Sequence, residues 1–297
     1  MSNYSFLLGW KHFVQNHVSE NPHSHVNVAK TKLSLEEKTK LNDQNRRLVP
    51  ELQAKQLEEN AQRHWDLFYK RNETRFFKDR RWTTREFEEL LSEPGDSQKV
   101  LLEVGCGVGN LIFPLIQENR NDYFYYACDF SPRAIELVKQ NPLYEPDRLS
   151  AFCCDVTTNT IFQYVQRESL DIITMVFVLS AIHPEKFRVV LHNLASLLKP
   201  GGVLLFRDYG LHDMAQLRFK PGHKIAENFY MRQDGTRSYY FSESEVASLM
   251  SECGLKVIAN SFIFRRTVNA KEGIDVPRIF IQGKFRKTDK EYNKDLR

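Results

Sequence analysis

Apolar runs of strand length recur along the second two-thirds of the chain, and stretches with helical spacing of apolar residues lie between them. From residue 99 onward the runs are "VLLEVG", "YFYYACDF", "LSAFCCDV", "LDIITMVFVLSAI" and "LLKPGGVLLFRDYG". Strands that alternate with helices predict an α/β fold built on a parallel, doubly wound sheet. Two late runs, "KVIANSFIFRRTV" and "PRIFIQGKF", predict a closing pair of strands, so the sheet domain is expected to span residues 99–287.

The segment before the sheet domain carries helix signals instead. Ser34 and Glu37 have the spacing of a capping box, which predicts the start of a helix. Pro50 fits the first turn of a second helix, whose apolar residues continue at helical spacing through the sequence "WDLF". Thr83 or Thr84 is expected to cap a further helix.

These signals divide the chain into four parts. Residues 34–98 are expected to form a helical extension in front of the sheet domain, and residues 288–297 a basic tail. Residues 1–33 are polar and lack clear periodicity, so we expect a poorly ordered extension. The first residues have neither the arginines of a transit peptide nor the apolar core of a signal peptide.

Composition narrows the class of protein. No apolar run is long enough to cross a bilayer, so no membrane association through a span is expected. The five cysteines are odd in number and never spaced as C-x-x-C, which argues against a disulfide framework and a cysteine-rich zinc site. A reducing compartment is therefore expected: the cytoplasm alone, or the cytoplasm together with the nucleus. The net charge of +4 is mild, so the position of the basic residues matters more than their number.

The most informative motif is "LLEVGCGVGN" at residues 101–110, where three glycines follow an apolar strand directly. Glycines at a strand-to-helix turn let the backbone approach a ligand closely. A dinucleotide-binding turn would place glycine where Asn110 stands, and a phosphate-binding P-loop would continue with Gly-Lys-Ser/Thr. The ligand is therefore of another kind.

Acidic residues end the first three strands of the predicted sheet: Glu103, Asp129 and Asp155. In a doubly wound sheet, ligands bind at these carboxyl ends. Asp129 is placed to accept hydrogen bonds from both hydroxyls of a ribose. Asp155 is placed to accept one from an adenine amino group, with the backbone of Val156 beside it. Any one such Asp is often only a helix cap. Three in succession behind a glycine turn predict a nucleoside-containing ligand.

This arrangement resembles the class I S-adenosylmethionine-dependent methyltransferases. "LLEVGCGVG" is similar to their first motif, and "LLKPGGVLLF" is similar to the turn before their fifth strand. The resemblance implies a Rossmann-like sheet and S-adenosyl-L-methionine as cofactor, with the helix before the sheet closing over it. The residues that it assigns to the cofactor are Trp65, Tyr69, Glu103, Gly105, Gly107, Asp129, Asp155, Val156 and Val176.

Several methyltransferase subclasses do not fit. Exocyclic-amine methylation of nucleic acids usually needs Asn/Asp-Pro-Pro-aromatic after strand four, where this chain has "FVLS". Cytosine-5 methylation needs a cysteine near that strand, and arginine methylation needs a pair of loop glutamates. His183 is more often structural than a metal ligand in such a position, so no metal is expected.

Basic and aromatic residues are interleaved before the sheet domain. From Arg63 to Arg85 there are eight Lys or Arg against three acids, with six aromatic residues among them. Aromatic side chains among basic ones can stack unpaired bases and hold phosphates. An amphipathic helix explains Trp65 and Phe68, but it explains the loop-like "TRFFKDRRW" less well, which favours RNA as substrate.

Longer strings resemble one family. "WDLFYKRN", "RFFKDRRWTTREFEEL", "FVLSAIHPEK" and "ENFYMRQDGTRSYYF" are similar to the eukaryotic tRNA 3-methylcytidine methyltransferases, from about residue 50 to 287. The form "WTTREFEEL" resembles the branch that acts on serine tRNAs and works with seryl-tRNA synthetase. The resemblance implies methylation at the first nucleotide of the anticodon loop. The expected RNA contacts are Arg71, Arg75, Phe76, Phe77, Lys78, Arg80, Arg81, Arg232, Arg237 and Lys284.

The chemistry needs few groups. Cytidine N3 carries a free lone pair at neutral pH, so no general base is required, and orientation can supply much of the rate. The product is positively charged, so a nearby carboxylate would help. Asp208 is the expected carboxylate, with Tyr209 and Arg207 beside it as further catalytic candidates. Alternatively, Asp208 only pairs with Arg207 and shapes the turn.

Two other functions remain open from the sequence. The chain is either a methyltransferase for a protein or a small molecule, or a non-catalytic RNA-binding subunit that keeps the fold. The intact glycine turn with Asp129 and Asp155 argues against a non-catalytic subunit, because such a subunit has no use for a cofactor site.

Overall fold

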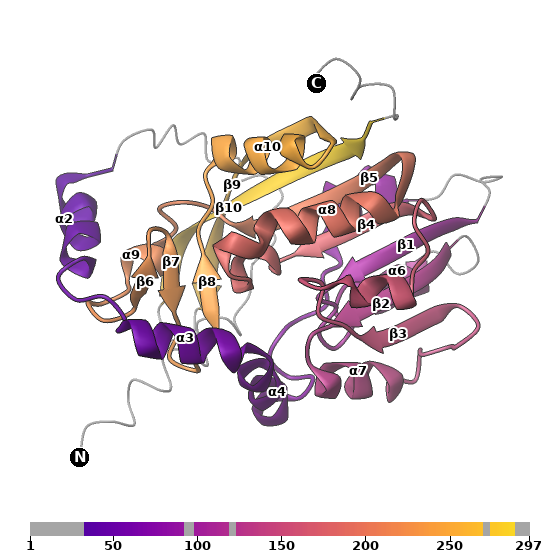
Figure 1. Ribbon diagram of the computed structural model, residues 1–297, viewed down its shortest axis with the longest axis horizontal. Helices are drawn as coiled ribbons and strands as arrows, with labels where there is room; N and C mark the ends of the chain where they lie inside the picture. Colours follow the sequence, from indigo (N-terminus) through magenta and orange to yellow (C-terminus); the bar gives the residue numbers. More distant parts are fainter. Residues whose placement is uncertain (1–32, 92–97, 119–122, 270–273, 289–297) are drawn as a thin grey trace.

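Seven strands form the central sheet in the order β3-β2-β1-β4-β5-β10-β9 (Figure 1). The structure, a computed structural model, describes residues 33–91, 98–118, 123–269 and 274–288. Strands β3, β2, β1, β4 and β5 run parallel to one another. At the end of the sheet β10 pairs antiparallel with both β5 and β9. The predicted α/β fold with a doubly wound, mostly parallel sheet is confirmed. The bounds of the seven strands are β1 Lys99–Val104, β2 Tyr123–Asp129, β3 Leu149–Cys153, β4 Leu170–Val176, β5 Leu198–Tyr209, β9 Leu255–Asn269 and β10 Ile274–Lys287.

Helices cover both faces of the sheet. The α-helices are α2 Leu35–Gln44, α3 Glu51–Glu59, α4 Ala61–Asn72, α5 Trp82–Glu86, α6 Ile112–Glu118, α7 Pro132–Lys139, α8 Phe187–Leu197, α9 Met214–Leu217 and α10 Glu243–Glu252. Short 3-10 helices are η1 Glu88–Leu90, η2 Asn159–Gln163, η3 Leu179–Ala181 and η4 Pro184–Lys186.

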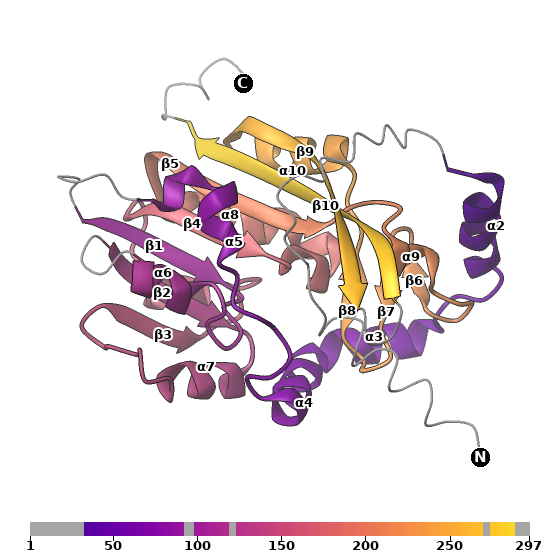
Figure 2. The same cartoon turned by 180° about the vertical axis from the view of Figure 1, so that it is seen from behind.

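Neighbouring residues of β1 point to opposite faces and enter two separate hydrophobic clusters. Leu102 packs in the cluster that contains the apolar side chains of α8 and α10. Leu101 packs in the cluster that contains those of α6 and α7. Both leucines are fully buried. Figure 1 shows α8 and α10 over one face, and Figure 2 shows α5 over the other, so strands buried on both sides form the core.

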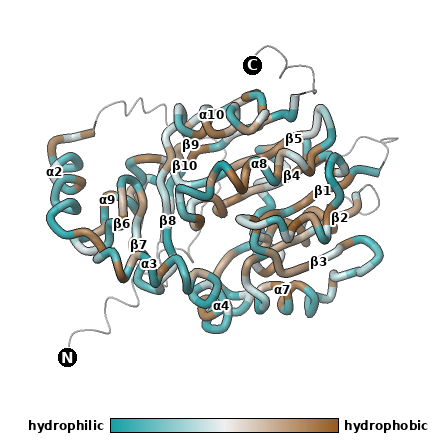
Figure 3. The backbone as a smooth tube through the Cα atoms, viewed as in Figure 1, coloured by the Kyte–Doolittle hydropathy of each residue, from teal (hydrophilic) through white to brown (hydrophobic). Residues whose placement is uncertain are grey.

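The N-terminal helices α2, α3 and α4 form an arm that lies outside the sheet (Figure 1). The capping box at its start is confirmed, because Ser34 Oγ accepts from Glu37 N at 3.2 Å and Glu37 Oε2 accepts from Ser34 N at 2.9 Å. Figure 3 shows that α3 and α4 are mostly hydrophilic, whereas the central strands are hydrophobic. The few apolar residues of α4 that are buried, Phe68 and Tyr69, pack against Val108 and Ala134 of the domain.

Two sequence expectations for this arm are wrong. The helix expected from Pro50 through "WDLF" is divided at Asn60, which leaves the helical geometry with φ −100° and ψ 14°. The helix expected to be capped by Thr83 or Thr84 begins at Trp82, and Thr83 Oγ1 donates backwards to the Arg80 carbonyl at 2.7 Å. The expectations for residues 1–32 and for the tail after residue 288 lie outside the described residues.

A second, three-stranded antiparallel sheet lies between β5 and α10 in the sequence. It consists of β6 Lys224–Ala226, β7 Phe229–Met231 and β8 Arg237–Tyr239, in the order β6-β7-β8. Figures 1 and 2 both place it beside α9 and above α3. The sequence analysis did not predict this sheet. A signal was present, since Asp234-Gly235 stands between two runs rich in aromatic residues, and Gly235 has φ +83°.

Candidate active site

The glycine turn after β1 adopts a backbone that other residues rarely take. Gly105, Gly107 and Gly109 have φ of +63°, +56° and +90°. A Cβ at Gly105 would lie 2.4 Å from Val178 Cγ2, and one at Gly107 would lie 2.9 Å from Tyr69 Oη. The glycines are therefore required both by backbone conformation and by close neighbours, one of which belongs to the N-terminal arm.

Asp129 at the end of β2 orders this turn. Its Oδ2 accepts from Gly107 N at 2.9 Å, and its Oδ1 accepts from Ser131 N at 2.9 Å. The side chain is 8% exposed, and burial raises the pKa of Asp129 to about 6, although the backbone donors oppose that shift. Each oxygen has a second lone pair that can accept a ligand hydroxyl.

Glu103 at the end of β1 is the most perturbed carboxyl of the site. Burial raises its pKa to about 8, against the opposing effects of the Arg80 guanidinium and the backbone N–H of Ile112. Its Oε2 is buried and has no hydrogen-bond partner among the described residues. A buried carboxylate oxygen without a partner fits a cationic group of a ligand.

Tyr69 and Trp65 on α4 cover the turn. Tyr69 is 5% exposed with its hydroxyl beside Gly107, and the Trp65 ring lies 6.3 Å from the Tyr69 ring. Asp66 fastens α4 to the start of α7, where it accepts from Ser131 Oγ at 2.8 Å and from Arg133 N at 3.1 Å. The predicted lid residues thus lie against the glycine turn.

Asp155 and Val156 follow β3 at the same edge of the sheet. Asp155 is half-buried, and its Oδ1 accepts from Thr157 N at 2.9 Å, as in a short Asx turn. Val156 is buried, with 8% exposed. Val176, at the end of β4, is buried too, and its carbonyl accepts from Arg80 Nη1 at 3.0 Å.

These residues fit S-adenosylmethionine. The unpartnered Glu103 oxygen suits the ammonium of its methionine part, and Asp129 suits the ribose hydroxyls. The glycine backbone leaves room for the chain that joins them. Each role remains a prediction for the individual residue.

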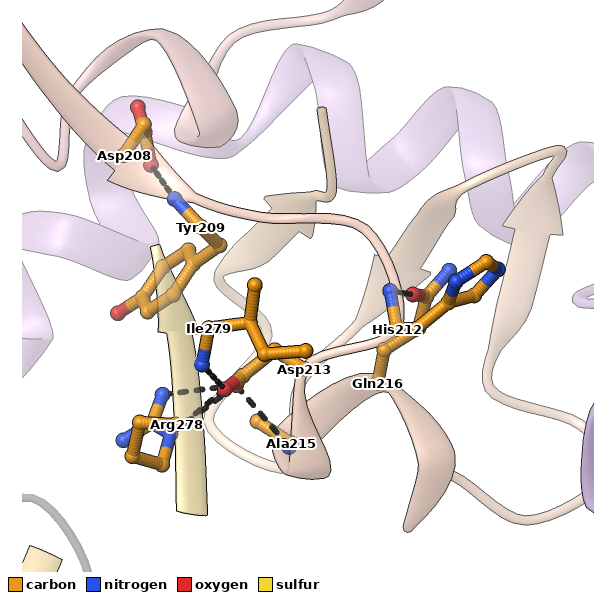
Figure 4. A network of polar contacts seen from close by, with 8 residues as sticks. All are labelled: Asp208, Tyr209, His212, Asp213, Ala215, Gln216, Arg278 and Ile279. Atoms are coloured by element: carbon orange, nitrogen blue, oxygen red, sulfur yellow. Dashed lines mark hydrogen bonds and ion pairs between the residues drawn. The ribbon is translucent and has the colours of Figure 1, made fainter. Parts of the chain in front are cut away.

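Asp208 is fully buried, and both of its oxygens accept hydrogen bonds, of which Figure 4 shows the one from Tyr209. Its Oδ2 accepts from Ser180 N at 2.9 Å, and its Oδ1 accepts from Tyr209 N at 2.9 Å. Burial raises the pKa of Asp208 to about 6. The carboxylate therefore ties η3 to the end of β5, and its catalytic role stays a prediction.

Arg207 points to the other side of β5. It forms an ion pair with Glu86 at 3.6 Å, and its guanidinium lies 4.2 Å from the Trp82 ring centroid. The alternative in which Asp208 pairs with Arg207 is wrong, because adjacent strand residues face opposite sides of a sheet. Arg207 packs α5 onto the sheet, and we do not retain it as a catalytic candidate.

Tyr209 lies in an aromatic corner with two arginines over it. Its half-buried ring is 5.1 Å from the Phe177 ring and 5.3 Å from the Arg232 guanidinium. The Arg278 guanidinium lies 6.0 Å from the centroid of the same ring. Phe177 has φ +60°, an uncommon conformation for an aromatic residue that is often found at functional sites.

A buried ion pair supports this corner (Figure 4). Arg278 Nη2 donates to Asp213 Oδ2 at 2.9 Å, and Arg278 Nε donates to Asp213 Oδ1 at 3.0 Å. Asp213 is fully buried and also accepts from the backbone of Ile279 at 2.7 Å and of Ala215 at 3.1 Å. Every acceptor position of the carboxylate is thereby occupied, and Arg278 is fixed beside Tyr209.

Arg80, expected to contact RNA phosphate, lies inside the site. Its guanidinium bonds to the Val176 carbonyl and lies 5.5 Å from the Phe177 ring, near Glu103 and Asp208. Its backbone N donates to the Asn110 carbonyl at 2.6 Å. The expectation of a surface position is wrong, because the loop after α4 folds inward over the glycine turn.

Two more expected RNA contacts are used within the protein. Arg237 is 5% exposed, forms an ion pair with Glu58 and donates to the Ala181 carbonyl at 3.3 Å. Lys284, which lies on β10, forms an ion pair with Glu89 at 2.9 Å. Neither residue is an exposed cation, because each is paired with an acid of another element, Glu58 of α3 or Glu89 of η1.

Phe76 and Phe77 belong to a small hydrophobic cluster under α4. Their rings lie 4.7 and 5.7 Å from the Phe68 ring, and both are partly buried. The interleaved aromatic residues are thus largely explained by packing. Among the expected RNA contacts the exposed ones in the described residues are Arg71, Arg75, Lys78 and Arg81.

His183 is a helix cap, since its Nδ1 accepts from Glu185 N at 3.4 Å. Among the residues that the structure describes, no group of three or more His, Cys, Asp or Glu side chains is placed to hold a metal ion. In the same part of the chain, no helix has both the length and the apolar character to cross a membrane.

Comparison with known proteins identifies the domain and its fold. The model of the methyltransferase domain family matches residues 69–260. The solved structure of an S-adenosylmethionine-dependent methyltransferase from Anabaena variabilis covers 77% of this chain and 95% of its own, with a TM-score of 0.56 and 14% identity, which shows the fold alone.

Two curated relatives are much closer in sequence. The tRNA N(3)-cytidine methyltransferase METTL6 of Mus musculus is 56% identical over 261 residues, covering 87% of this chain and 92% of that protein. The tRNA N(3)-cytidine methyltransferase METTL2 of Danio rerio is 40% identical over 277 residues, covering 82% of this chain and 78% of that protein. The chain belongs to the S-adenosylmethionine-dependent tRNA N(3)-cytidine methyltransferase family.

Proposed function

We propose that this protein methylates N3 of cytidine in tRNA, at the first nucleotide of the anticodon loop of serine tRNAs. One observation carries the proposal. The 56% identity to the mouse relative extends over 87% of the chain, beyond the residues 69–260 that match the general methyltransferase domain. The likeness therefore includes parts that general methyltransferases do not need.

The site has the groups that this reaction requires. Bound S-adenosylmethionine supplies an electrophilic methyl group, and the N3 lone pair of cytosine takes it without a general base. Tyr209 and Phe177 offer aromatic faces for a base turned out of its stack. The guanidinium groups of Arg80 and Arg232 lie beside them and can donate to the cytosine carbonyl.

Charge balance explains why a buried carboxylate is useful here. The methylated ring becomes a cation close to Arg80 and Arg232, which would disfavour it. Asp208 lies behind Tyr209 and interacts electrostatically with Arg232 and Arg80. An ionised Asp208 offsets their charge where the positive charge develops, at a place from which water is excluded.

The serine-tRNA assignment rests on the branch-specific strings. "WTTREFEEL" forms α5 and η1, which contact Arg207 and β10 through Glu86 and Glu89 and bury Thr83, Phe87 and Leu90. The higher identity to the mouse protein, 56%, than to the Danio rerio protein, 40%, supports the same branch. Cooperation with seryl-tRNA synthetase is part of this proposal.

A panel of tRNAs tests the specificity. Transcripts of serine, threonine and arginine tRNAs are incubated with the protein and isotopically labelled S-adenosylmethionine, with and without seryl-tRNA synthetase. We expect label in serine tRNA at the first anticodon-loop nucleotide, and a faster reaction with the synthetase. Label in threonine tRNA alone would overturn the serine assignment, and a lack of response to the synthetase would overturn the partnership.

The same assay weighs the two other functions. A methyltransferase for protein or small molecules would leave all three tRNAs unlabelled. A non-catalytic subunit would bind tRNA without transferring label even when the synthetase is present.

A further inference from the structure

A cavity of about 530 Å³ lies next to the glycine turn and is open to solvent. None of the cofactor-binding candidates contributes to its lining. Its walls come from three separate places in the sequence: the loop after α4, the glycine turn continuing into α6, and the turn after α7. The volume falls within the range of small-ligand sites, roughly 300–1,000 Å³. The reactive corner, formed by Tyr209, Phe177, Arg232 and Arg278, does not line it either.

The lining combines three kinds of group. Phe77 and Phe113 supply aromatic walls, and Asn110 and Gln117 supply amides. Lys78 and Arg81 supply exposed cations, whereas the acid of the lining, Asp79, accepts from Asn110 Nδ2 at 3.4 Å. Aromatic faces for a base, amides for its edges and cations for a phosphate are what recognition of unpaired RNA requires.

The cavity and the reactive corner lie on two sides of one short segment. Arg80 sends its side chain inward to the Val176 carbonyl, and the next residue, Arg81, turns outward to Gln117 Oε1 at 3.0 Å. Adjacent Cα atoms are only about 3.8 Å apart. One continuous single strand can therefore reach both places.

The segment itself is held firmly against the glycine turn. Arg80 N donates to the Asn110 carbonyl at 2.6 Å, and Asn110 Nδ2 donates to the Phe77 carbonyl at 3.2 Å. The cavity is thus formed before any ligand arrives, which reduces the entropy lost on binding.

We propose that this cavity binds an unpaired nucleotide of the substrate tRNA, close in sequence to the methylated cytidine, with its phosphate on Lys78 and Arg81. The proposal rests on the proposed function. It assigns to the loop after α4 two tasks: Arg80 serves the reactive base, and its neighbours hold another nucleotide of the same loop.

Matched pairs of variants test this assignment. Thr74 is an exposed lining residue, so Thr74→Trp fills the cavity from its rim without disturbing the core. The double variant Lys78→Ala/Arg81→Ala removes two cations from the cavity. The double variant Lys40→Ala/Arg46→Ala is the control, since it removes two exposed cations that neither line the cavity nor stand among the expected RNA contacts. The dissociation constants of a serine tRNA transcript and of S-adenosylmethionine are measured for each.

We expect Thr74→Trp and Lys78→Ala/Arg81→Ala to weaken tRNA binding about tenfold or more, the scale of one lost base contact. The control should weaken it about threefold or less, and cofactor affinity should stay within about twofold of the parent. In addition, a photoreactive benzoylphenylalanine at position 74 should crosslink to one anticodon-loop nucleotide other than the methylated one.

Equal weakening by both double variants would overturn the proposal, because it would show diffuse attraction to charge. Parental tRNA binding by Thr74→Trp, or crosslinks spread along the stem, would also overturn it. If instead the parent protein itself methylates no tRNA, the proposed function fails, and this outcome is separate from the other three.

Discussion

Three carboxyl groups are buried at the carboxyl ends of the parallel strands: Glu103, Asp129 and Asp208. In each, burial raises the pKa, to about 8, about 6 and about 6. They differ in their partners. Asp129 and Asp208 accept two backbone hydrogen bonds each, whereas Glu103 keeps one oxygen without a partner among the described residues. At the residue scale, therefore, the groups divide into two whose oxygens are bonded to the backbone and one, Glu103, that we predict binds a cationic group of the cofactor.

The Glu103 assignment predicts proton release when the cofactor binds. With a pKa of about 8, the carboxyl is mostly protonated at pH 7 in the free protein. Pairing with an ammonium group ionises it, so binding should release roughly 0.9 proton at that pH. Calorimetric titration in two buffers of different ionisation enthalpy measures this number. Glu103→Gln should bind the cofactor more weakly and should release no proton. Equal proton release by the parent and the variant would contradict the assignment.

The same group makes the free protein sensitive to pH. The folded-state pKa of Glu103 is raised above its ordinary value of 4.5. Its contribution to stability is therefore fully present below about pH 4.5 and is lost as pH rises through about 8. In the absence of cofactor, Glu103→Gln should gain stability relative to the parent between pH 7 and 9, as measured by thermal unfolding.

Asp208 predicts a pH profile for the chemical step. Because its pKa is about 6, the single-turnover rate at saturating cofactor should rise with pH through about 6 and then level off. In Asp208→Asn the rate should fall by roughly a hundredfold or more and lose that rise. The variant also loses stability, since an Asn amide would set a donor against Ser180 N or Tyr209 N. A parental rate in the variant would show that the carboxylate is only structural.

At the scale of elements, the lid helix α4 and the glycine turn are fitted to each other. A Cβ at Gly107 would lie 2.9 Å from Tyr69 Oη, and φ is +56° there. Gly107→Ala should therefore weaken cofactor binding, both through strain of about 1–2 kcal/mol and by pushing the lid away.

A second substitution separates these two causes. Tyr69→Phe removes the clashing oxygen, so it should restore part of the affinity in the Gly107→Ala background while not improving the parent protein. Gly201→Ala is the control, because φ is +77° with no neighbour within 4 Å of its Cβ. It should lower stability and leave cofactor affinity unchanged. Strictly additive effects at positions 69 and 107 would contradict the coupling.

The elements that carry the cofactor could be predicted from the sequence, because they depend on local signals. Each strand–turn–helix pattern, the glycine turn and each strand-end acid is a signal confined to a few neighbouring residues. The direction of individual arginines could not be predicted. Arg80, Arg207 and Arg237 read as surface or catalytic cations, but each is committed to a partner distant in sequence: the Val176 carbonyl, Glu86 or Glu58. The break at Asn60 likewise follows from tertiary packing of α4 on α7, not from the helical spacing of its apolar residues.

At the scale of the whole molecule, a half-buried acid links the arm to the domain. Glu58 on α3 accepts from Lys186 at 2.5 Å and forms an ion pair with Arg237 of β8. Burial opposes ionisation, but these two cations lower the pKa of Glu58 overall. The contact links α3 to η4 and to the small sheet, and so sets how the arm and the reactive corner face one tRNA.

Glu58→Gln should release this link. It leaves Arg237 without its charged partner, so we expect a loss of about 1–3 kcal/mol in unfolding free energy and faster amide exchange in α3. The stabilising effect is present above pH 4.5 and is lost as pH falls through the lower folded-state pKa. The control Glu59→Gln removes an exposed acid that lies 4.0 Å from Lys55 and should change stability by about 0.5 kcal/mol or less. Equal effects of the two variants would contradict the proposed link.

The proposed reaction forms 3-methylcytidine in tRNA from S-adenosylmethionine. The direct test is mass spectrometry of nucleosides from a serine tRNA transcript incubated with the protein, seryl-tRNA synthetase and cofactor carrying a labelled methyl group. The account predicts one labelled nucleoside, 3-methylcytidine, which disappears with Asp129→Ala because the ribose loses its acceptor. Label in 5-methylcytidine, N4-methylcytidine or another nucleoside, or unlabelled tRNA in the presence of folded protein that binds the cofactor, would contradict it.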